Sequence, residues 1–591
     1  MPPTSLPLVQ PRPQASGPSA PAQAVHGVQR VLLFCLPYQH LRLSSLSTAH
    51  LATLLRERGF SCAEVYVHFE LARLMGAERY REITDGMDGL SGELLFAEAL
   101  RGELPEPDAQ AKLEQLFGPV ERRREMIQKL ESFCLSWVER ERPSLIGIST
   151  SFNQLTPALW VARIIKRAGH RVRVVLGGSA CSEPMGPQIL DSYPEIDWVV
   201  SGYGEEPLLA LCRGEEPEQR LIRSTRPVDL ERLPIPDYGS FLEQAREFAE
   251  DPLLMLTFES SRGCWWGQVN HCTFCGLNGV EMAFYEKSSP RVVTEIRALW
   301  ERYRRNLFAT DTIMSRDHLK RVMPELAGFS DGPRLFYEVK ANMSQADVVT
   351  LSRAKVLRLQ PGIESLSTRL LGLLKKGINT IRNLALLKWC RERGIGLSWN
   401  QLCGIPGERA EDYDAQIALM QLIPHFPPPD GVNPIHIDRY SPYFDKFSEF
   451  GWAELSPLPE YRLLHPELEP AQVRNIAYHF SGLGGVSTAD YQPRFEQAVT
   501  TWRQRYTQEE GLFLDPEQGL VRNGPEQGLR YPLDPVIARV LESTHEVASI
   551  SRVLAEARCP RALLVELERH GILFIEGESV LNLAVRTQPP G

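Results

Sequence analysis

Short apolar segments alternate with amphipathic ones along residues 29–214. The apolar runs have the length of buried strands, and residues 43–58 between the first two show helical periodicity. Strands separated by helices pair in parallel, so the pattern predicts an α/β, doubly wound parallel sheet. The predicted strands are residues 30–36, 63–67, 145–149, 172–176 and 197–200.

A Pro-punctuated linker, residues 215–250, separates this domain from a second series of strand–helix units at 251–445. Consecutive βα units predict a barrel whose functional residues lie at the carboxyl ends of its strands. Six units, rather than eight, predict an open, partial (β/α)6 barrel. The six strands are expected to start near Met255, Leu307, Leu335, Val356, Ile395 and Asn433.

The rest of the chain is expected to form two smaller parts. Residues 446–525 are predicted to cover the barrel. In 526–591, a helical pair precedes two short strands around Glu576-Gly577, which indicates a small α+β, winged-helix-like module. Such a module could bind a partner or cap the barrel, and the pattern leaves both alternatives open.

Composition limits the possible environment and partners. A net charge of −9 across 591 residues argues against non-specific binding to nucleic acid or an anionic membrane. No stretch approaches the roughly 18 apolar residues that cross a bilayer. Residues 1–28 hold seven prolines and one formal charge, Arg12, and are predicted to be a disordered tail. Eleven scattered cysteines favour a reducing, cytoplasmic location.

The strongest chemical signal is a C-x7-C-x2-C motif formed by Cys264, Cys272 and Cys275 in a Gly-rich turn. A four-iron cluster normally takes four cysteines, so three would leave one iron open to a ligand. With His271, the same thiols could form a Cys3His zinc site, although no second ligand pair follows nearby. Three unrelated buried thiols would be unusual in such a turn. The residues favour an iron–sulfur site over zinc.

Cys272-Thr-Phe274-Cys275 resembles the end of the radical S-adenosylmethionine (SAM) signature, although the family usually has three residues, not seven, between its first two cysteines. The wider segment 262–279 resembles the radical SAM proteins of RiPP maturation, which are C-methyltransferases acting on ribosomally made peptides. The resemblance covers roughly residues 30–485. It includes segments 308–313, 337–342, 360–365, 387–390, 399–400, 404–408 and 438–443.

The resemblance implies that Cys264, Cys272 and Cys275 hold a [4Fe-4S] cluster to which SAM binds. Polar residues and glycines at the predicted strand ends and in the cysteine loop are candidate SAM contacts. Glu338, Lys340 and Asn342 are expected to share one face of a strand. The full candidate set is Phe274, Gly276, Asp311, Glu338, Lys340, Asn342, Glu364 and Gly404.

The strand ends of the first domain resemble the S-x-L and GG elements of cobalamin-binding domains. Candidate cobalamin contacts are Ser149, Gly177, Gly178 and Glu206. Residues 29–90 lack a D-x-H-x-x-G motif, so a cobalt-ligating histidine from that motif is not expected.

Together these features predict a cobalamin-dependent radical SAM C-methyltransferase that modifies an unactivated carbon of a ribosomal precursor peptide. An electron donor such as flavodoxin or ferredoxin is implied, and the C-terminal module could read the leader of the peptide. One alternative is a radical SAM peptide modifier without methyl transfer, such as a cyclase, epimerase or hydroxylase. Another is a non-catalytic iron–sulfur or zinc peptide-binding protein.

Overall fold

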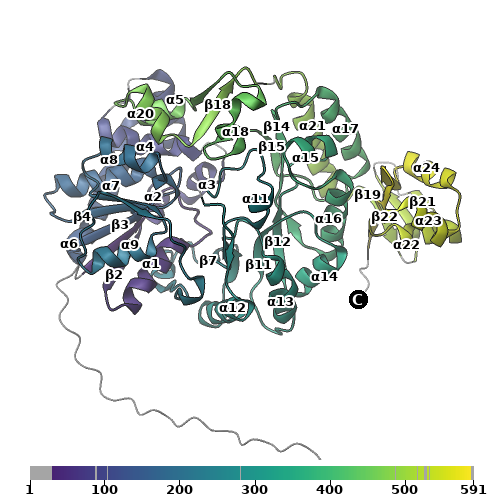
Figure 1. The fold of residues 1–591 in the computed structure, drawn as a ribbon, viewed down its shortest axis with the longest axis horizontal. Helices are drawn as coiled ribbons and strands as arrows, with labels where there is room; N and C mark the ends of the chain where they lie inside the picture. Colours follow the sequence, from purple (N-terminus) through teal and green to yellow (C-terminus); the bar gives the residue numbers. More distant parts are fainter. Residues whose placement is uncertain are drawn as a thin grey trace, which may run out of the picture.

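The structure, a computed structural model, describes residues 30–86, 89–102, 104, 106–279, 281–485, 487–515, 517–524, 529–531 and 533–587. The predicted tail 1–28 lies outside these residues. Three parts follow one another across the molecule, with the first parallel sheet at one end and the C-terminal module at the other (Figure 1).

The first domain is a six-stranded parallel sheet with the order β2-β1-β3-β4-β5-β6. Alternate residues of β1 enter different cores: Leu32 and Phe34 pack on one face, Val31 and Leu33 on the other. Both faces are therefore buried, as the apolar runs predicted. The strands are β1 (Arg30–Cys35), β2 (Ser61–Tyr66), β3 (Leu145–Ser149), β4 (Arg173–Gly177), β5 (Trp198–Gly202) and β6 (Leu221–Ser224).

A helix or several helices occupy every connection between successive strands of this sheet. The strand order reverses between β1 and β3, and ligands of doubly wound sheets bind beyond the carboxyl strand ends at such a point. The helices are α1 (Leu46–Glu57), α2 (Val67–Met75), α3 (Ala77–Asp85), α4 (Gly89–Arg101), α5 (Pro107–Phe117), α6 (Val120–Glu141), α7 (Leu155–Arg167), α8 (Met185–Ser192) and α9 (Glu205–Cys212).

The second domain contains the predicted succession of parallel strands, split into two sheets. Five strands have the order β13-β12-β11-β10-β7, and β14 pairs separately with β15. An isolated bridge between Glu364 and Gln401 links the two groups. The strands are β7 (Met255–Phe258), β10 (Asn306–Ala309), β11 (Leu335–Val339), β12 (Val356–Pro361), β13 (Gly396–Leu397), β14 (Asn400–Cys403) and β15 (Gly431–Pro434).

Helices follow these strands along the chain and surround them in Figure 1. They are α12 (Ser289–Tyr303), α13 (Arg316–Ala327), α14 (Gln345–Arg353), α15 (Thr368–Leu373), α16 (Thr380–Arg393) and α17 (Ala410–Leu422).

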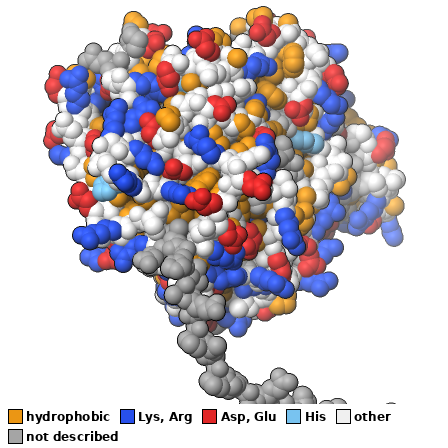
Figure 2. Space-filling model, turned by 60° about the vertical axis from the view of Figure 1, so that its left-hand side comes forward, with side chains coloured by type: hydrophobic (Ala, Val, Ile, Leu, Met, Phe, Trp, Pro, Cys, Tyr) orange, Lys and Arg blue, Asp and Glu red, His pale blue; other side chains and the backbone are white. Residues whose placement is uncertain are grey.

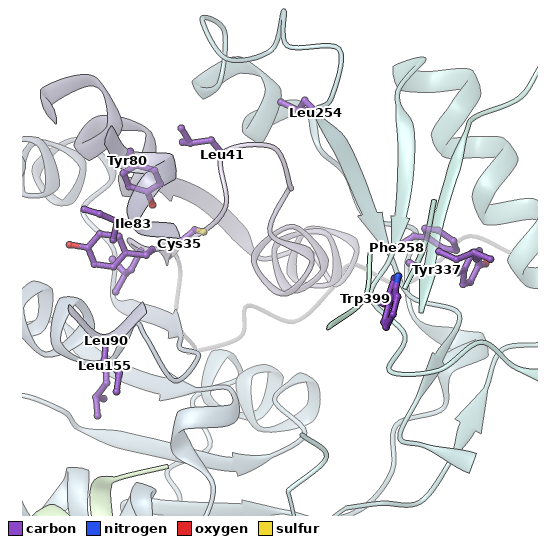
Figure 3. Close-up of a cluster of buried hydrophobic side chains, with 14 of the residues drawn as sticks. Cys35, Leu41, Tyr80, Ile83, Leu90, Leu155, Leu254, Phe258, Tyr337 and Trp399 are labelled. Atoms are coloured by element: carbon purple, nitrogen blue, oxygen red, sulfur yellow. The ribbon is translucent and has the colours of Figure 1, made fainter. Parts of the chain in front are cut away.

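One hydrophobic core runs through both domains. Leu41 of the first and Leu254 of the second belong to the same buried cluster, as do Phe258 and Tyr337 of the second sheet (Figure 3). A parallel bridge joins Leu43 to Met255. The two domains are therefore packed as one body.

The covering segment forms the antiparallel sheet β16-β18-β17, which packs beside the first domain, followed by a long helix. Tyr193 Oη of the first domain lies 2.7 Å from His465 Nδ1 and donates to Glu467 Oε1 at 2.9 Å, which ties the two parts together. The elements are β16 (Ile437–Asp438), β17 (Glu454–Pro457), β18 (His479–Leu483) and α21 (Gln492–Thr507).

The C-terminal module has the winged-helix order of elements, with three helices and the antiparallel sheet β22-β24-β23. A second sheet, β21-β20-β19-β25, was not predicted; it starts before residue 526 and recruits β25 (Val585–Arg586). The module comprises β19 (Gly511–Asp515), β20 (Gly519–Asn523), β21 (Leu529–Tyr531), α22 (Pro535–Ser543), β22 (Ala548–Ser549), α23 (Ile550–Ala557), α24 (Arg561–Arg569), β23 (Leu573–Glu576) and β24 (Ser579–Asn582).

Charges of both signs are interspersed over the face drawn in Figure 2, as a mixed composition predicts. Among the described residues, no helix is both long and apolar enough to cross a membrane.

Candidate functional site

The three motif cysteines lie in one loop that leaves the carboxyl end of β7. Cys264 caps the short helix α11 (Trp265–Val269), and its Sγ accepts a hydrogen bond from Gly267 N at 3.3 Å. All three thiols are free and half-buried. Burial, followed by the nearby Cys272 and Cys264 thiols, raises the pKa of Cys275 to about 12. Iron bound to the three sulfurs would offset the repulsion between their thiolate forms.

His271 is engaged in a way that favours a cluster over zinc. Its Nε2 lies 2.7 Å from the carbonyl oxygen of Cys275, so this nitrogen donates within the loop. In the described part of the chain, no three His, Cys, Asp or Glu side chains are grouped as ligands of a single metal ion. A four-iron cluster binds each cysteine at a different iron, so it does not require such a group.

Two lysines and two aromatic rings surround the cysteine loop. Lys340 Nζ lies 3.3 Å from the centre of the Trp266 ring and donates to Lys376 O at 2.5 Å. Lys376 Nζ pairs with Glu364 at 3.1 Å and lies 5.5 Å from the ring of Phe274. The predicted candidates Phe274, Lys340 and Glu364 are thus brought together beside the cysteines.

Asp311 lies beneath the loop and is fully buried. One carboxylate oxygen accepts from Ser260 N at 2.7 Å and Ser261 N at 3.0 Å, and the other accepts from Ser260 Oγ. Ser260 Oγ also lies 3.1 Å from His318 Nδ1. Asp311 therefore fixes the residues that lead into Arg262 and Cys264.

Lys340 and Asn342 differ in position from the sequence expectation, whereas Glu338 lies on β11 as expected. Strand β11 ends at Val339, so Lys340 and Asn342 lie beyond it and the expected strand alternation stops at Glu338. Asn342 is exposed. Burial, followed by Asp311 and Glu364, raises the pKa of Glu338 to about 7. Glu338 is thus a half-buried carboxyl beside the other acidic groups of the site.

The two candidate glycines are required by the backbone. A Cβ on Gly276 would lie 2.2 Å from Arg439 O, so only glycine fits against this chain segment. Gly404 has φ +77° and donates to Glu408 Oε1 at 3.1 Å. Both glycines shape the loops of the site, whatever binds there.

A cavity of about 710 Å³ lies between the two domains. Its walls come from the carboxyl ends of the first sheet, from α1, from the cysteine loop and from Tyr440. Of the predicted cobalamin contacts, Ser149, Gly177 and Gly178 line it. Glu206 is exposed and is not among the lining residues, whereas its neighbour Glu205 is.

Arg262 connects the domains across this cavity. It donates to Glu259 Oε1 at 2.6 Å and to Glu205 Oε1, on α9, at 2.7 Å. Although burial opposes it, this pair of carboxylates raises the pKa of Arg262. Arg262 ties the loop that carries Cys264 to the strand ends of the first sheet.

Sequence reasoning missed several residues of the cavity wall, notably His50, Glu259, Ser261 and Arg262. Arg262 and Ser261 stand directly before Cys264, and that proximity was an available signal. His50 gave none, because a single histidine within an apolar helix usually packs in the core.

Comparison with known proteins adds independent evidence. Residues 258–419 match the family model of the Radical SAM superfamily. This stretch is a radical SAM domain. Such a domain implies a [4Fe-4S] cluster and SAM, as the cysteine motif predicted.

The chain is also 24% identical over 315 residues to an uncharacterized methyltransferase of Pyrococcus horikoshii; the match covers 48% of this chain and 66% of that protein. The fold of the present chain is similar to that of the radical SAM methyltransferase TsrM from Kitasatospora setae, in a structure with cobalamin and a [4Fe-4S] cluster bound. That similarity has a TM-score of 0.53 and 15% identity, and covers 91% of this chain and 100% of TsrM. The TsrM structure with tryptophan substrate and a SAM analogue gives a TM-score of 0.51 and 17% identity over 73% of this chain and 79% of that one.

Proposed function

We propose that the protein is a cobalamin-dependent radical SAM C-methyltransferase that modifies a ribosomal precursor peptide. The observation that carries this proposal is the cavity that joins the carboxyl strand ends of the first sheet to the cysteine loop. One cavity would thus bring a methyl carrier and a radical generator together. The methyltransferase names of the relatives and the cobalamin of TsrM support the same reading.

The cavity wall fits a large cofactor. Gly178 has φ +97°, and a Cβ there would lie 2.3 Å from Thr150 O. Gly202, with φ +100°, is equally restricted by Ser224 O. Because neither glycine carries a side chain, the carboxyl ends of the strands stay accessible. The flat corrin ring of cobalamin could lie against them. His50, Glu259 and Ser261 also each contribute to this wall a buried polar atom that has no partner among the described residues.

When bound, the cofactors supply a radical that removes hydrogen from carbon, and a methyl group that replaces it. The protein positions the cofactors and the substrate and excludes water from the site. Cys264, Cys272 and Cys275 would hold the cluster, and Trp266 and Phe274 cover the loop with apolar surface. Arg262 keeps the loop and the first sheet in fixed relation, which methyl transfer between two sites requires.

A peptide substrate is supported by the outer surface of the loop and by the C-terminal module. Val269 is 82% exposed and Leu277 60%, so apolar side chains flank the cysteines on the open side. Leu277 also lines the cavity. The module has a winged-helix order of elements, a fold that can bind an extended leader by adding a strand to its sheet.

Methyl-deuterated SAM tests methyl transfer. With the cognate precursor, the product peptide should carry all three methyl deuterons on carbon, as read by mass spectrometry and fragment sequencing. A product lighter by two hydrogens, or heavier without the label, would instead indicate a peptide modifier without methyl transfer.

Hydrogen exchange of the full-length protein tests leader binding. If the module reads the leader, adding the precursor should protect amides within residues 573–582. Protection confined to the cavity and cysteine loop, with unchanged exchange in the module, would make the module a structural cap.

A further inference from the structure

The wall of the cavity contains three polar atoms that the described chain leaves without hydrogen-bond partners. They are His50 Nε2, Glu259 Oε2 and Ser261 Oγ. His50 is 5% exposed and Ser261 3%, and all three residues line the same cavity. An unpartnered buried polar atom costs about 1–3 kcal/mol, so one such atom is unusual and three on one wall point to a ligand.

The surrounding contacts fix these groups in place. Glu259 Oε1 is held by Arg262 at 2.6 Å, which leaves Oε2 as the free acceptor. Ser261 N donates to Asp311 at 3.0 Å, which anchors the residue while its hydroxyl remains free. His50 lies on α1 of the first domain, and its electrostatic interaction with Glu259 places the two side chains near each other. The wall is therefore built from both domains and is preorganised.

The hydrogen-bonding roles identify the class of group that fits. Glu259 Oε2 can only accept, and a ligand must bring an N–H or O–H to it. Burial lowers the pKa of His50 to about 4, so its ring is uncharged and can donate from Nε2. Ser261 can donate or accept. A group with both N–H donors and a carbonyl acceptor matches this set.

Charge narrows the choice further. Arg262 is paired with both Glu205 and Glu259. Among the described residues, four carboxylates and two cations line the cavity, so the wall disfavours an anion such as phosphate or carboxylate. They are Glu183, Glu205, Glu259, Glu281, Arg223 and Arg262. A neutral carboxamide satisfies both hydrogen-bonding roles without adding charge.

We infer that His50, Glu259 and Ser261 form a subsite for one primary carboxamide on the rim of the corrinoid. This inference rests on the proposed function, because it takes the occupant of the cavity to be cobalamin, whose ring carries such amides at its periphery. The amide N–H donates to Glu259 Oε2, and its carbonyl accepts from His50 or Ser261. His50 is thereby a hydrogen-bonding residue and not a ligand to cobalt.

Isomeric cobalamin monocarboxylic acids, each with one ring amide replaced by a carboxylic acid, test the subsite. Binding to the full-length protein is measured by equilibrium dialysis. One isomer should bind wild type at least about tenfold more weakly than cobalamin, because its carboxylate faces Glu259. Glu259→Gln should bind that isomer better than wild type does, since the glutamine oxygen can still accept from Arg262 while its NH2 replaces Oε2.

Glu183→Gln is the matched control. Glu183 lines the same cavity, but Arg223 already holds both its oxygens, at 2.6 and 3.1 Å. The Glu183→Gln substitution should leave unchanged the ratio of the affinity for the monocarboxylic acid to the affinity for cobalamin. Retention of unmodified cobalamin by Glu259→Gln checks that this variant is folded.

The outcomes separate the two proposals. If wild type binds no cobalamin, the proposed function itself fails. If wild type binds cobalamin but no isomer shows the exchange of preference in Glu259→Gln, the subsite is wrong and the free atoms are met by water. Electron paramagnetic resonance of the cob(II)alamin form should show no nitrogen splitting; splitting that disappears in His50→Phe would place His50 on cobalt and overturn the assignment.

Discussion

The radical SAM domain meets its two neighbours through very different interfaces. Towards the first sheet it leaves a cavity of about 710 Å³, and polar atoms of its wall find no partner in the part of the chain that the structure describes. Towards the C-terminal module, buried Lys388 on α16 donates to Asn582 Oδ1 at 2.7 Å, Asn582 O at 3.0 Å and His545 O at 3.4 Å. Lys388 finds three acceptors within this joint, which marks the lysine as structural, whereas the polar atoms left open at the cavity indicate a ligand.

The largest effect should come from Cys272→Ala. Loss of one of three thiolates should abolish both cluster incorporation and SAM cleavage, while the interface with the module stays intact. Iron content after anaerobic reconstitution, 5′-deoxyadenosine formation and thermal unfolding check this.

Cys403→Ala is the control for that substitution, because Cys403 is buried at the end of β14, away from the motif. It should retain the iron and the cleavage activity. Cluster formation in Cys272→Ala at the wild-type level would contradict the assignment of the three cysteines.

Lys388→Met should weaken the interface with the module. Asn582 Oδ1 and Asn582 O would lose the lysine donor, whereas His545 O would keep the bond from Trp389 Nε1 at 3.3 Å. The free energy of unfolding should fall by about 3 kcal/mol near neutral pH. Thermal or urea unfolding measures this. An unchanged stability would mean that the module is held by apolar contacts alone.

The same lysine should give the wild-type protein a pH dependence. Burial lowers the pKa of Lys388 to about 7, against about 10.4 in an unfolded chain. Between these values the unfolded chain binds a proton that the folded chain lacks, so stability rises with pH, by up to about 1.4 kcal/mol per unit. Between pH 7 and 9 the free energy of unfolding should rise less in Lys388→Met than in the wild type. Equal slopes in the two proteins would contradict the lowered pKa of Lys388.

A smaller effect is expected at the open interface from Glu205→Gln. It weakens one charge-assisted hydrogen bond to Arg262, so the interdomain joint should lose about 1–2 kcal/mol. Melting temperature and cobalamin retention should both fall, with iron content unchanged. Glu206→Gln, at the exposed neighbouring residue, should change neither the melting temperature nor cobalamin retention. An equal effect of the two substitutions would contradict the role of the Glu205–Arg262 pair in joining the domains.

The strands and the cysteines could be predicted because their signals are local. Apolar runs such as 145–149 form buried parallel strands, and the three cysteines lie within twelve residues. The predicted radical SAM domain and the predicted parallel α/β sheets are confirmed. The precursor peptide and the individual SAM and cobalamin contacts stay predictions.

The remaining features depend on contacts that no local pattern reveals. Glu205 and Glu206 are adjacent, and only the phase of α9 decides which one enters the cavity. Asn342 was placed on a strand that ends three residues earlier. His50 meets Glu259 only through packing of two domains, more than 200 positions apart in the chain. Such pairings arise from tertiary structure, which periodicity does not encode.

The residues that line the cavity emerge at widely separated times during translation. Its wall begins with Leu33 in the first strand and is completed by Tyr440, so the first domain can fold on the ribosome well before its pocket exists. Domains generally fold as units while the chain is elongated. The wall of the site is therefore complete only after most of the protein has emerged, and we expect cofactor loading to follow translation.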